Sequence, residues 1–297
     1  MAEREVRYCT TEDGVRIAYC VEGAGPPLLA ALGIESFALD HLFPENAAFF
    51  QRLCETFTVI RYDLRGVGLS DRFPEVIDVS SLGKDLDAVA AAAGIQRFAL
   101  FTYLTSGPVA LEWAIRHQGI LSHLILFETL AAYSRLFSAE LVQSVGEMAR
   151  AGAMGFVAQS FANEPMRRQF PVQAGAVAKA IADSIDGEVY ARLFASVQPL
   201  DVSGQLAELR VPTLVLNRQG DPFFNPSLVR SWHVPSRVRP SGCWKGTATT
   251  TRSRTRSLFW TPSRRSLHLI VRAHRRTHRL RSTCERSCSP TSLATPR

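Results

Sequence analysis

The chain has 297 residues, 46% of them hydrophobic, which is enough apolar sequence for one large domain or two small ones. Glu3 and Glu5 near the start, and the lack of a long apolar run, argue against a signal peptide and a membrane span, so we expect a cytoplasmic protein with no membrane partner. The six cysteines are spread along the chain, and only Cys284 and Cys288 have a C-x-x-x-C spacing. This usage predicts reduced thiols, no disulfide framework, no metal and no other cofactor.

The net charge of +7 is distributed unevenly about Arg230. Residues 1–230 hold 19 basic and 26 acidic side chains, a net charge of −7, whereas residues 231–297 hold 15 basic side chains and a single acidic one, for a net charge of +14. The second stretch contains 14 Arg and 21 Ser or Thr, with no sustained helical or strand period. We therefore expect a folded domain over residues 1–230 and a disordered tail over residues 231–297.

The acidic part begins with two alternating runs on either side of Glu12-Asp13-Gly14, which predict a β-hairpin over residues 5–21. Short apolar runs then predict buried strands at residues 28–32, 58–62, 98–103, 124–127 and 212–216. Helical periods at residues 82–93 and 109–117 lie between these strands. Apolar strands that alternate with helices are typical of a mostly parallel sheet covered on both faces, so the expected fold class is α/β.

From about residue 131 to residue 209 the alternation stops. Consecutive amphipathic helices are predicted there instead, around Leu141, Phe156, residues 177–181 and residues 193–197. We expect an all-helical lid inserted between two strands of the sheet. The alternative is a set of surface helices packed on one sheet face.

Residues 62–71 have the sequence Tyr-Asp-Leu-Arg-Gly-Val-Gly-Leu-Ser-Asp. Gly66 and Gly68 permit a tight loop after the strand, and Arg65 and Asp71 can tie that loop by opposite charge. The segment resembles the Y-D-x-R-G-x-G-x-S-D loop of the α/β-hydrolases, and the later strands and helices follow in the order of that family. The resemblance covers roughly residues 7–230 and implies an α/β-hydrolase fold.

In that family the nucleophile lies in a G-x-S-x-G turn between a strand and a helix. The usual register places Thr102 and Ser106 at the glycine positions and Leu104 at the serine position, and a leucine cannot attack a carbonyl. A shift by one residue makes Thr105 central, with Gly107 behind it, and Ser106 is a second alternative nucleophile. An ordinary capping hydroxyl is the competing interpretation for Thr105 and Ser106.

The resemblance also implies roles for residues elsewhere in the chain. Asp221 falls where the family places its catalytic acid, although an aspartate in a turn before proline is an equal alternative. Gly33 matches the glycine of an H-G dipeptide whose histidine is replaced by Leu32, so the N–H groups of Ile34 and Thr105 are the expected oxyanion-hole donors. The histidines after the strand at residues 212–216 all lie in the arginine-rich tail, so no general base is recognised; they are His233, His268, His274 and His278.

Translation in a shifted reading frame explains the abrupt change after Arg230. Back-translating residues 231–263 and regrouping the bases by one can yield the family's closing strand, a catalytic-histidine segment and an amphipathic last helix. Residues 288–297 can yield LFTDIVGNTE, which resembles the opening of a class III adenylate or guanylate cyclase domain. Under this hypothesis the parent is a multidomain cyclase, and the hydrolase-like domain of this chain is truncated at its last strand and helix. An uncovered sheet edge, low stability and aggregation are then expected.

Three functions remain open at this stage. The leading one is a catalytically defective domain that senses a small apolar ligand between sheet and lid and regulates a cyclase-type parent. The alternative is an esterase-like hydrolase that acts on a small acyl substrate through Thr105 or Ser106 with Asp221. The third is nucleic-acid binding by the tail, whose charge predicts non-specific, salt-sensitive association with polyanions.

Overall fold

The computed structural model describes residues 4–31, 33–42, 44–104, 106–161, 171–216 and 238–240. All of these residues belong to one unit, Met1–Thr261, and the second unit, Pro262–Arg297, lies outside the described residues. The predicted domain boundary at residue 230 also lies outside them, as does most of the basic tail.

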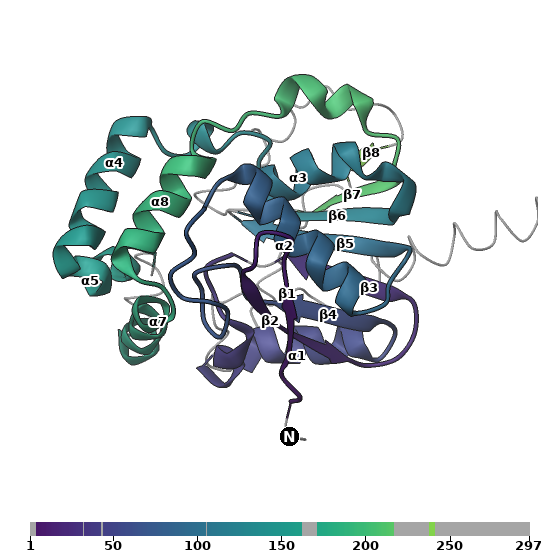
Figure 1. Cartoon of the computed structure of the whole chain (residues 1–297), viewed down its shortest axis with the longest axis horizontal. Helices are drawn as coiled ribbons and strands as arrows, with labels where there is room; N and C mark the ends of the chain where they lie inside the picture. Colours follow the sequence, from purple (N-terminus) through teal and green to yellow (C-terminus); the bar gives the residue numbers. More distant parts are fainter. Residues whose placement is uncertain are drawn as a thin grey trace, which may run out of the picture. The chain divides into compact units, whose positions relative to one another are not determined.

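The described strands form one eight-stranded sheet in the order β1-β2-β4-β3-β5-β6-β7-β8 (Figure 1). Their bounds are β1 Arg7–Thr10, β2 Arg16–Glu22, β3 Pro27–Ala31, β4 Thr58–Tyr62, β5 Phe98–Leu104, β6 Leu121–Thr129, β7 Thr213–Leu216 and β8 Val238–Pro240. The hairpin β1–β2 and the pair β2–β4 are antiparallel, and every other pair is parallel. The predicted hairpin and the mostly parallel sheet are confirmed. Parallel strands place their carboxyl ends at one edge, where such sheets bind ligands.

The eighth strand corrects one detail of the sequence analysis, which expected the sheet to end before its last strand. Val238–Pro240 pairs in parallel with Thr213–Val215 of β7, although these three residues belong to the tail. The free edge of β7 presents backbone N–H and C=O groups that any extended segment can pair with. Such pairing needs no alternating side-chain pattern, which is why the sequence did not indicate it.

Helices cover both faces of the sheet (Figure 1). Their bounds are α1 Pro44–Cys54, α2 Val79–Ala92 and α3 Gly107–Arg116. Phe101 of β5 packs on Phe49 of α1, with ring centroids 5.7 Å apart, whereas Phe98 of β5 packs on Trp113 of α3 at 6.2 Å. Residues three apart in a strand point to opposite faces, so α1 lies on one side of the sheet and α3 on the other.

The start of α2 follows from a short capping motif. The Asp78 carboxylate accepts a hydrogen bond from the Ser81 N–H at 2.7 Å, and the Asp78 N–H donates to the Ser81 hydroxyl at 2.9 Å. This reciprocal cap satisfies two backbone N–H groups at the start of the helix and contributes about 1 kcal/mol. Leu82, Leu86 and Val89 then lie on the buried face of the helix.

The insertion between β6 and β7 is helical throughout its described part. It contains η3 Tyr133–Arg135, α4 Ala139–Met148, η4 Ala149–Ala153, α5 Met154–Phe161, α7 Pro171–Ser184, α8 Gly187–Val197 and η5 Ser203–Glu208. Glycines let α8 approach its neighbours closely, because a Cβ on Gly187 would lie 2.1 Å from the Ala149 carbonyl oxygen of η4, and one on Gly146 of α4 would lie 3.2 Å from the Ala191 Cβ of α8. Within the described ranges every helix is too short or too polar to span a bilayer. Cys9, Cys20 and Cys54 are free thiols.

Candidate functional site

A hollow lies at the carboxyl ends of β3 and β4, beneath α8 of the helical insertion. About 490 Å³ in and around it is free of atoms, part of it open to solvent, and the cavity volume proper is about 30 Å³. One water needs roughly 10–15 Å³ by that measure. The hollow is therefore narrow and partly open to solvent, and a ligand of more than a few atoms requires its wall to widen.

The wall of the hollow is almost entirely apolar. Its described apolar residues are Ala31, Gly33, Ile34, Leu64, Leu82, Leu86, Val109, Ala110, Leu193, Phe194 and Val197. The hydroxyl-bearing residues of the described wall are Tyr62, Ser106 and Tyr133, and none of its described residues carries a formal charge. No group of His, Cys, Asp and Glu within the described ranges has the arrangement of a metal site.

The turn between β5 and α3 lies where the sequence predicted it. β5 ends at Leu104 and α3 begins at Gly107. A Cβ on Gly107 would lie 1.5 Å from Oγ1 of Thr129 at the end of β6, so only glycine allows the helix to start this close to the neighbouring strand. The turn is thus packed tightly against the end of β6.

Ser106 is the N-cap residue of α3, but the predicted capping role of its hydroxyl is wrong. The Ser106 backbone is already helical, and the second helical residue is Pro108, which has no N–H to accept from. The Ser106 hydroxyl instead donates toward the carbonyl oxygens of Tyr103 at 2.7 Å and Ala31 at 3.0 Å. It also lies 2.9 Å from Oγ1 of Thr102. None of these described partners is a base that would activate Ser106 as a nucleophile.

The remaining predicted site residues divide into two groups. Gly33 and Ile34 line the hollow together with Ser106, so the structure brings these three positions together. Leu104 is the last residue of β5. Thr105 and Asp221 lie outside the described residues, and so do Leu32 and the tail histidines, so their roles stay predictions.

Asp63 joins two loops that border the hollow. Its Oδ2 accepts hydrogen bonds from the Ser36 hydroxyl at 2.6 Å and the Leu69 N–H at 2.9 Å, and its Oδ1 accepts from the Phe37 N–H at 3.0 Å. A Cβ on Gly68 would lie 2.2 Å from Asp63 Oδ2, which explains the glycine at φ +57°. Burial raises the pKa of Asp63 to about 6, although the three hydrogen bonds favour the charged form.

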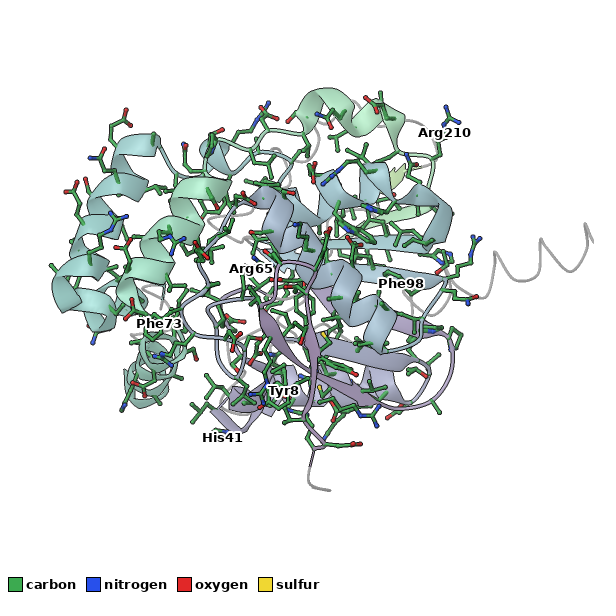
Figure 2. All side chains as sticks on the ribbon, viewed as in Figure 1. Tyr8, His41, Arg65, Phe73, Phe98 and Arg210 are labelled. Atoms are coloured by element: carbon green, nitrogen blue, oxygen red, sulfur yellow. The ribbon has the colours of Figure 1, made fainter. Side chains whose placement is uncertain are left out.

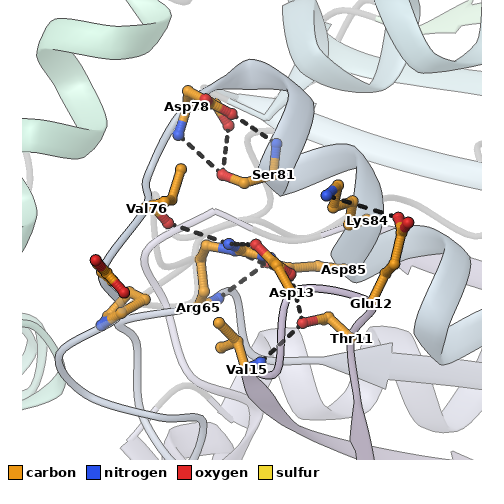
Figure 3. Close-up of polar contacts among 12 residues, drawn as sticks. Thr11, Glu12, Asp13, Val15, Arg65, Val76, Asp78, Ser81, Lys84 and Asp85 are labelled. Carbon is orange, nitrogen blue, oxygen red and sulfur yellow. Dashed lines mark hydrogen bonds and ion pairs between the residues drawn. The ribbon is translucent and has the colours of Figure 1, made fainter.

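Arg65 is a buried cation that saturates all five of its N–H groups (Figure 3). Its Nε and Nη2 donate to Asp85 at 3.0 and 2.8 Å, and Nη1 and Nη2 donate to Asp13 at 2.7 and 3.1 Å. Its second Nη1 proton goes to the carbonyl oxygen of Val76 at 3.1 Å. Figure 2 shows Arg65 between the hairpin and α2. One guanidinium therefore ties the hairpin turn, α2 and the loop after β4 together.

The predicted ion pair between Arg65 and Asp71 is wrong. The Asp71 carboxylate accepts from the Arg16 N–H at 2.7 Å, and the Asp71 N–H donates to the Arg16 carbonyl at 2.9 Å. These two bonds fix Asp71 at the start of β2, while the Arg65 side chain points inward. The loop is tied by charge as expected, but to partners distant in sequence.

Glu128 is a candidate functional residue that the sequence did not indicate. Tyr103 pairs with Phe127 across the sheet and Leu104 pairs with Thr129, so Glu128 is the extra residue of a β-bulge at the end of β6. It is fully buried and has a positive φ of 46°. Bulges and strained backbone are common beside functional sites. The signal in the sequence is an acidic residue that follows an apolar strand.

A second missed carboxylate, Glu35, lies on the other face of the sheet. The Tyr103 hydroxyl donates to it, and burial raises the pKa of both groups. The Tyr103 ring packs on Phe101, which contacts α1. Glu35 is not among the described residues of the hollow, so this pair joins the loop after β3 to β5 from behind the site.

The loop after β4 holds the corner between α7 and α8. The Gly68 N–H donates to the Ser184 carbonyl at 2.8 Å, and Arg72 donates to the Asp183 carbonyl at 3.0 Å. Arg192 of α8 donates to the Pro74 carbonyl at 3.2 Å and also to the carbonyl of Glu75. Phe73 of the same loop lies on the side of the helical insertion (Figure 2). These bonds keep α8 over the hollow.

Several solved structures have the same fold as this chain. A hydrolase from Pseudomonas aeruginosa PA01 matches with a TM-score of 0.66 and 24% identity, over 76% of this chain and 84% of that chain. An enol-lactonase from Burkholderia xenovorans LB400 matches with a TM-score of 0.66 and 20% identity, over 78% and 88% of the two chains. A thermophilic esterase from Thermogutta terrifontis matches with a TM-score of 0.64 and 26% identity, over 80% and 88%.

These matches and the strand order show that the chain has the α/β-hydrolase fold. No protein-family model matches the chain, and no curated protein matches it by sequence. The fold class expected from the sequence is confirmed.

Proposed function

We propose that this domain binds a small apolar molecule in the hollow under α8 and does not hydrolyse it. The observation that carries the proposal is the state of Ser106. Its hydroxyl borders the hollow but is engaged by two backbone carbonyls and has no base among its described partners. The family's serine position is occupied by Leu104, which has no nucleophilic atom. A domain of this kind is suited to sensing or regulation.

The hollow also sets the strength of binding that is expected. A ligand that buries about 200 Å² of apolar surface gains roughly 5 kcal/mol from the hydrophobic effect. Loss of translational and rotational freedom offsets part of this gain, and opening of the lid offsets more. The net free energy of binding is therefore small, and dissociation constants of about a millimolar or weaker are expected for ligands of about eight heavy atoms.

A second candidate function is hydrolysis of an ester or lactone. It is favoured by the similar structures, which are a hydrolase, an enol-lactonase and an esterase. In this case Thr105 or Ser106 is the nucleophile, Asp221 is the acid, and the N–H groups of Ile34 and Thr105 bind the oxyanion.

Hydrolysis of p-nitrophenyl butyrate distinguishes the two candidates. We expect a rate no higher than that of buffer with unrelated protein. Turnover that is lost in Thr105→Ala or Ser106→Ala, and retained in Ser144→Ala, would instead establish the hydrolase. Ser144 is a suitable control because it is exposed on α4 and bonds only locally to the Glu140 carbonyl.

We also infer that the residues after Arg230 come from a shifted reading frame and that the parent protein continues into a cyclase domain. The support is the charge change from −7 to +14 and the two sequence resemblances in the shifted frame. The nucleotide sequence tests this inference, because an uninterrupted frame across codon 230 refutes it. As translated, the tail should bind heparin and release it as salt is added.

A further inference from the structure

Two largely buried tyrosines line the hollow, and none of the described residues is hydrogen-bonded to either hydroxyl. Tyr62, at the end of β4, is 1% exposed, and Tyr133, in η3, is 2% exposed. Both border the hollow, and neither hydroxyl bonds to a residue in the described part of the chain. Neither hydroxyl oxygen is among the fully buried polar atoms that lack a partner in the described residues, so each keeps some surface that water or a ligand can reach.

The phenols reach the hollow from different elements and are held by apolar neighbours. The Tyr133 ring packs on Phe137 at 5.4 Å and on Phe194 of α8 at 5.8 Å. Tyr62 is a strand residue in the main apolar core. Burial raises the pKa of both hydroxyls, so they remain neutral proton donors at ordinary pH.

Charge near the hollow opposes an anionic occupant. None of the described lining residues is charged, so an ion would lose its hydration without gaining a counter-ion. The carboxylates of Asp85 and Asp87 are close enough to Tyr62 to add to the rise in its pKa.

We infer that the hollow takes a neutral, mainly aliphatic molecule with a carbonyl-type oxygen, which accepts hydrogen bonds from Tyr62 and Tyr133. The inference rests on the proposed binding function and adds the chemical class of the ligand. The apolar wall accommodates the aliphatic body, and the phenols fix the oxygen. A hydrocarbon of the same shape fills the space but leaves both hydroxyls unpaired.

Three matched probes test the inference. They are 2-heptanone, its isostere 2-methyl-1-heptene, in which CH₂ replaces the oxygen, and heptanoate at pH 8. Ligand-observed NMR titration should give the tightest binding for the ketone, with the alkene and the carboxylate at least about fivefold weaker. Tyr62→Phe and Tyr133→Phe should each weaken the ketone by about 2–10-fold and leave the alkene unchanged. Tyr19→Phe, a buried phenol outside the hollow, should change neither.

Thermal unfolding without ligand separates recognition from a structural role. Removing an unpartnered hydroxyl should leave Tm unchanged or raise it. A lower Tm with parallel loss of ketone and alkene binding would assign the phenols a structural role and overturn the inference. Equal binding of ketone and alkene, unaffected by either Phe variant, would overturn it while leaving the binding function standing. Binding of none of the probes would refute the binding function itself.

Discussion

Arg65 is the buried cation that ties the hairpin turn to α2, and Arg65→Met should destabilise the domain by about 3–5 kcal/mol. All five N–H groups of Arg65 are paired, and Asp85 is fully buried. The variant leaves the Asp85 carboxylate without its cation, and burial already raises the pKa of Asp85 to about 6. At about 2–4 °C per kcal/mol, the expected fall in Tm is about 6–20 °C.

Urea unfolding at pH 7.5 measures this loss, and a surface ion pair provides its control. Arg150→Met removes an exposed pair with Glu188, for which at most about 1 kcal/mol is expected. Adding Asp85→Asn to Arg65→Met removes the stranded charge and should recover part of the stability. If Arg65→Met lowers the free energy of unfolding by no more than Arg150→Met does, Arg65 does not hold the hairpin turn to α2 as described.

Three further predictions concern the site. Burial raises the pKa of Asp63 to about 6, so the folded protein binds a proton at Asp63 more tightly than the unfolded chain does. The stabilisation from this proton is complete below about pH 3.8 and is lost as pH rises through 6. Stability should therefore grow by about 1 kcal/mol between pH 7.5 and 5 on this account, and an unchanged pH slope in Asp63→Asn would contradict it. Gly107→Ala should lower the free energy of unfolding by about 1–3 kcal/mol or more, whereas Gly175→Ala in an open helical position should be neutral or stabilising; urea unfolding compares the two. Arg192→Ala should speed both binding and release of 2-heptanone in NMR exchange measurements, while Arg150→Ala should not, and equal rates would show that Arg192 does not hold α8 over the hollow.

The buried strands were the most predictable part of the fold. β3 and β5 lie between other strands with helices on both faces, so nearly every residue is apolar and the run stands out in the sequence. The loop after β4 was predictable for a different reason, since both of its glycines have positive φ and are required where the chain passes close to Val189, at Gly66, and to Asp63, at Gly68. The positions of Gly33 and Ile34 at the hollow were predicted from the resemblance of Leu32-Gly33 to the H-G dipeptide of the α/β-hydrolases.

Features set by distant contacts were not predictable. The partners of Arg65 lie 52 and 20 residues away, and only the packed topology selects them over the nearby Asp71. The hydroxyl of Ser106 turns from the helix to the end of β3, which depends on the spacing of two strands. β8 depends on backbone pairing alone, and backbone groups leave no trace in the sequence.

Covalent labelling tests most directly the claim that the site binds without hydrolysis. The protein is incubated with diethyl p-nitrophenyl phosphate, which phosphorylates activated serine or threonine hydroxyls, and its intact mass is measured beside a known serine esterase. Since Leu104 has no hydroxyl and the Ser106 hydroxyl is held by carbonyls, the account predicts an unchanged mass. A single diethylphosphoryl adduct that maps to Thr105 or Ser106 would contradict the account and establish a working nucleophile.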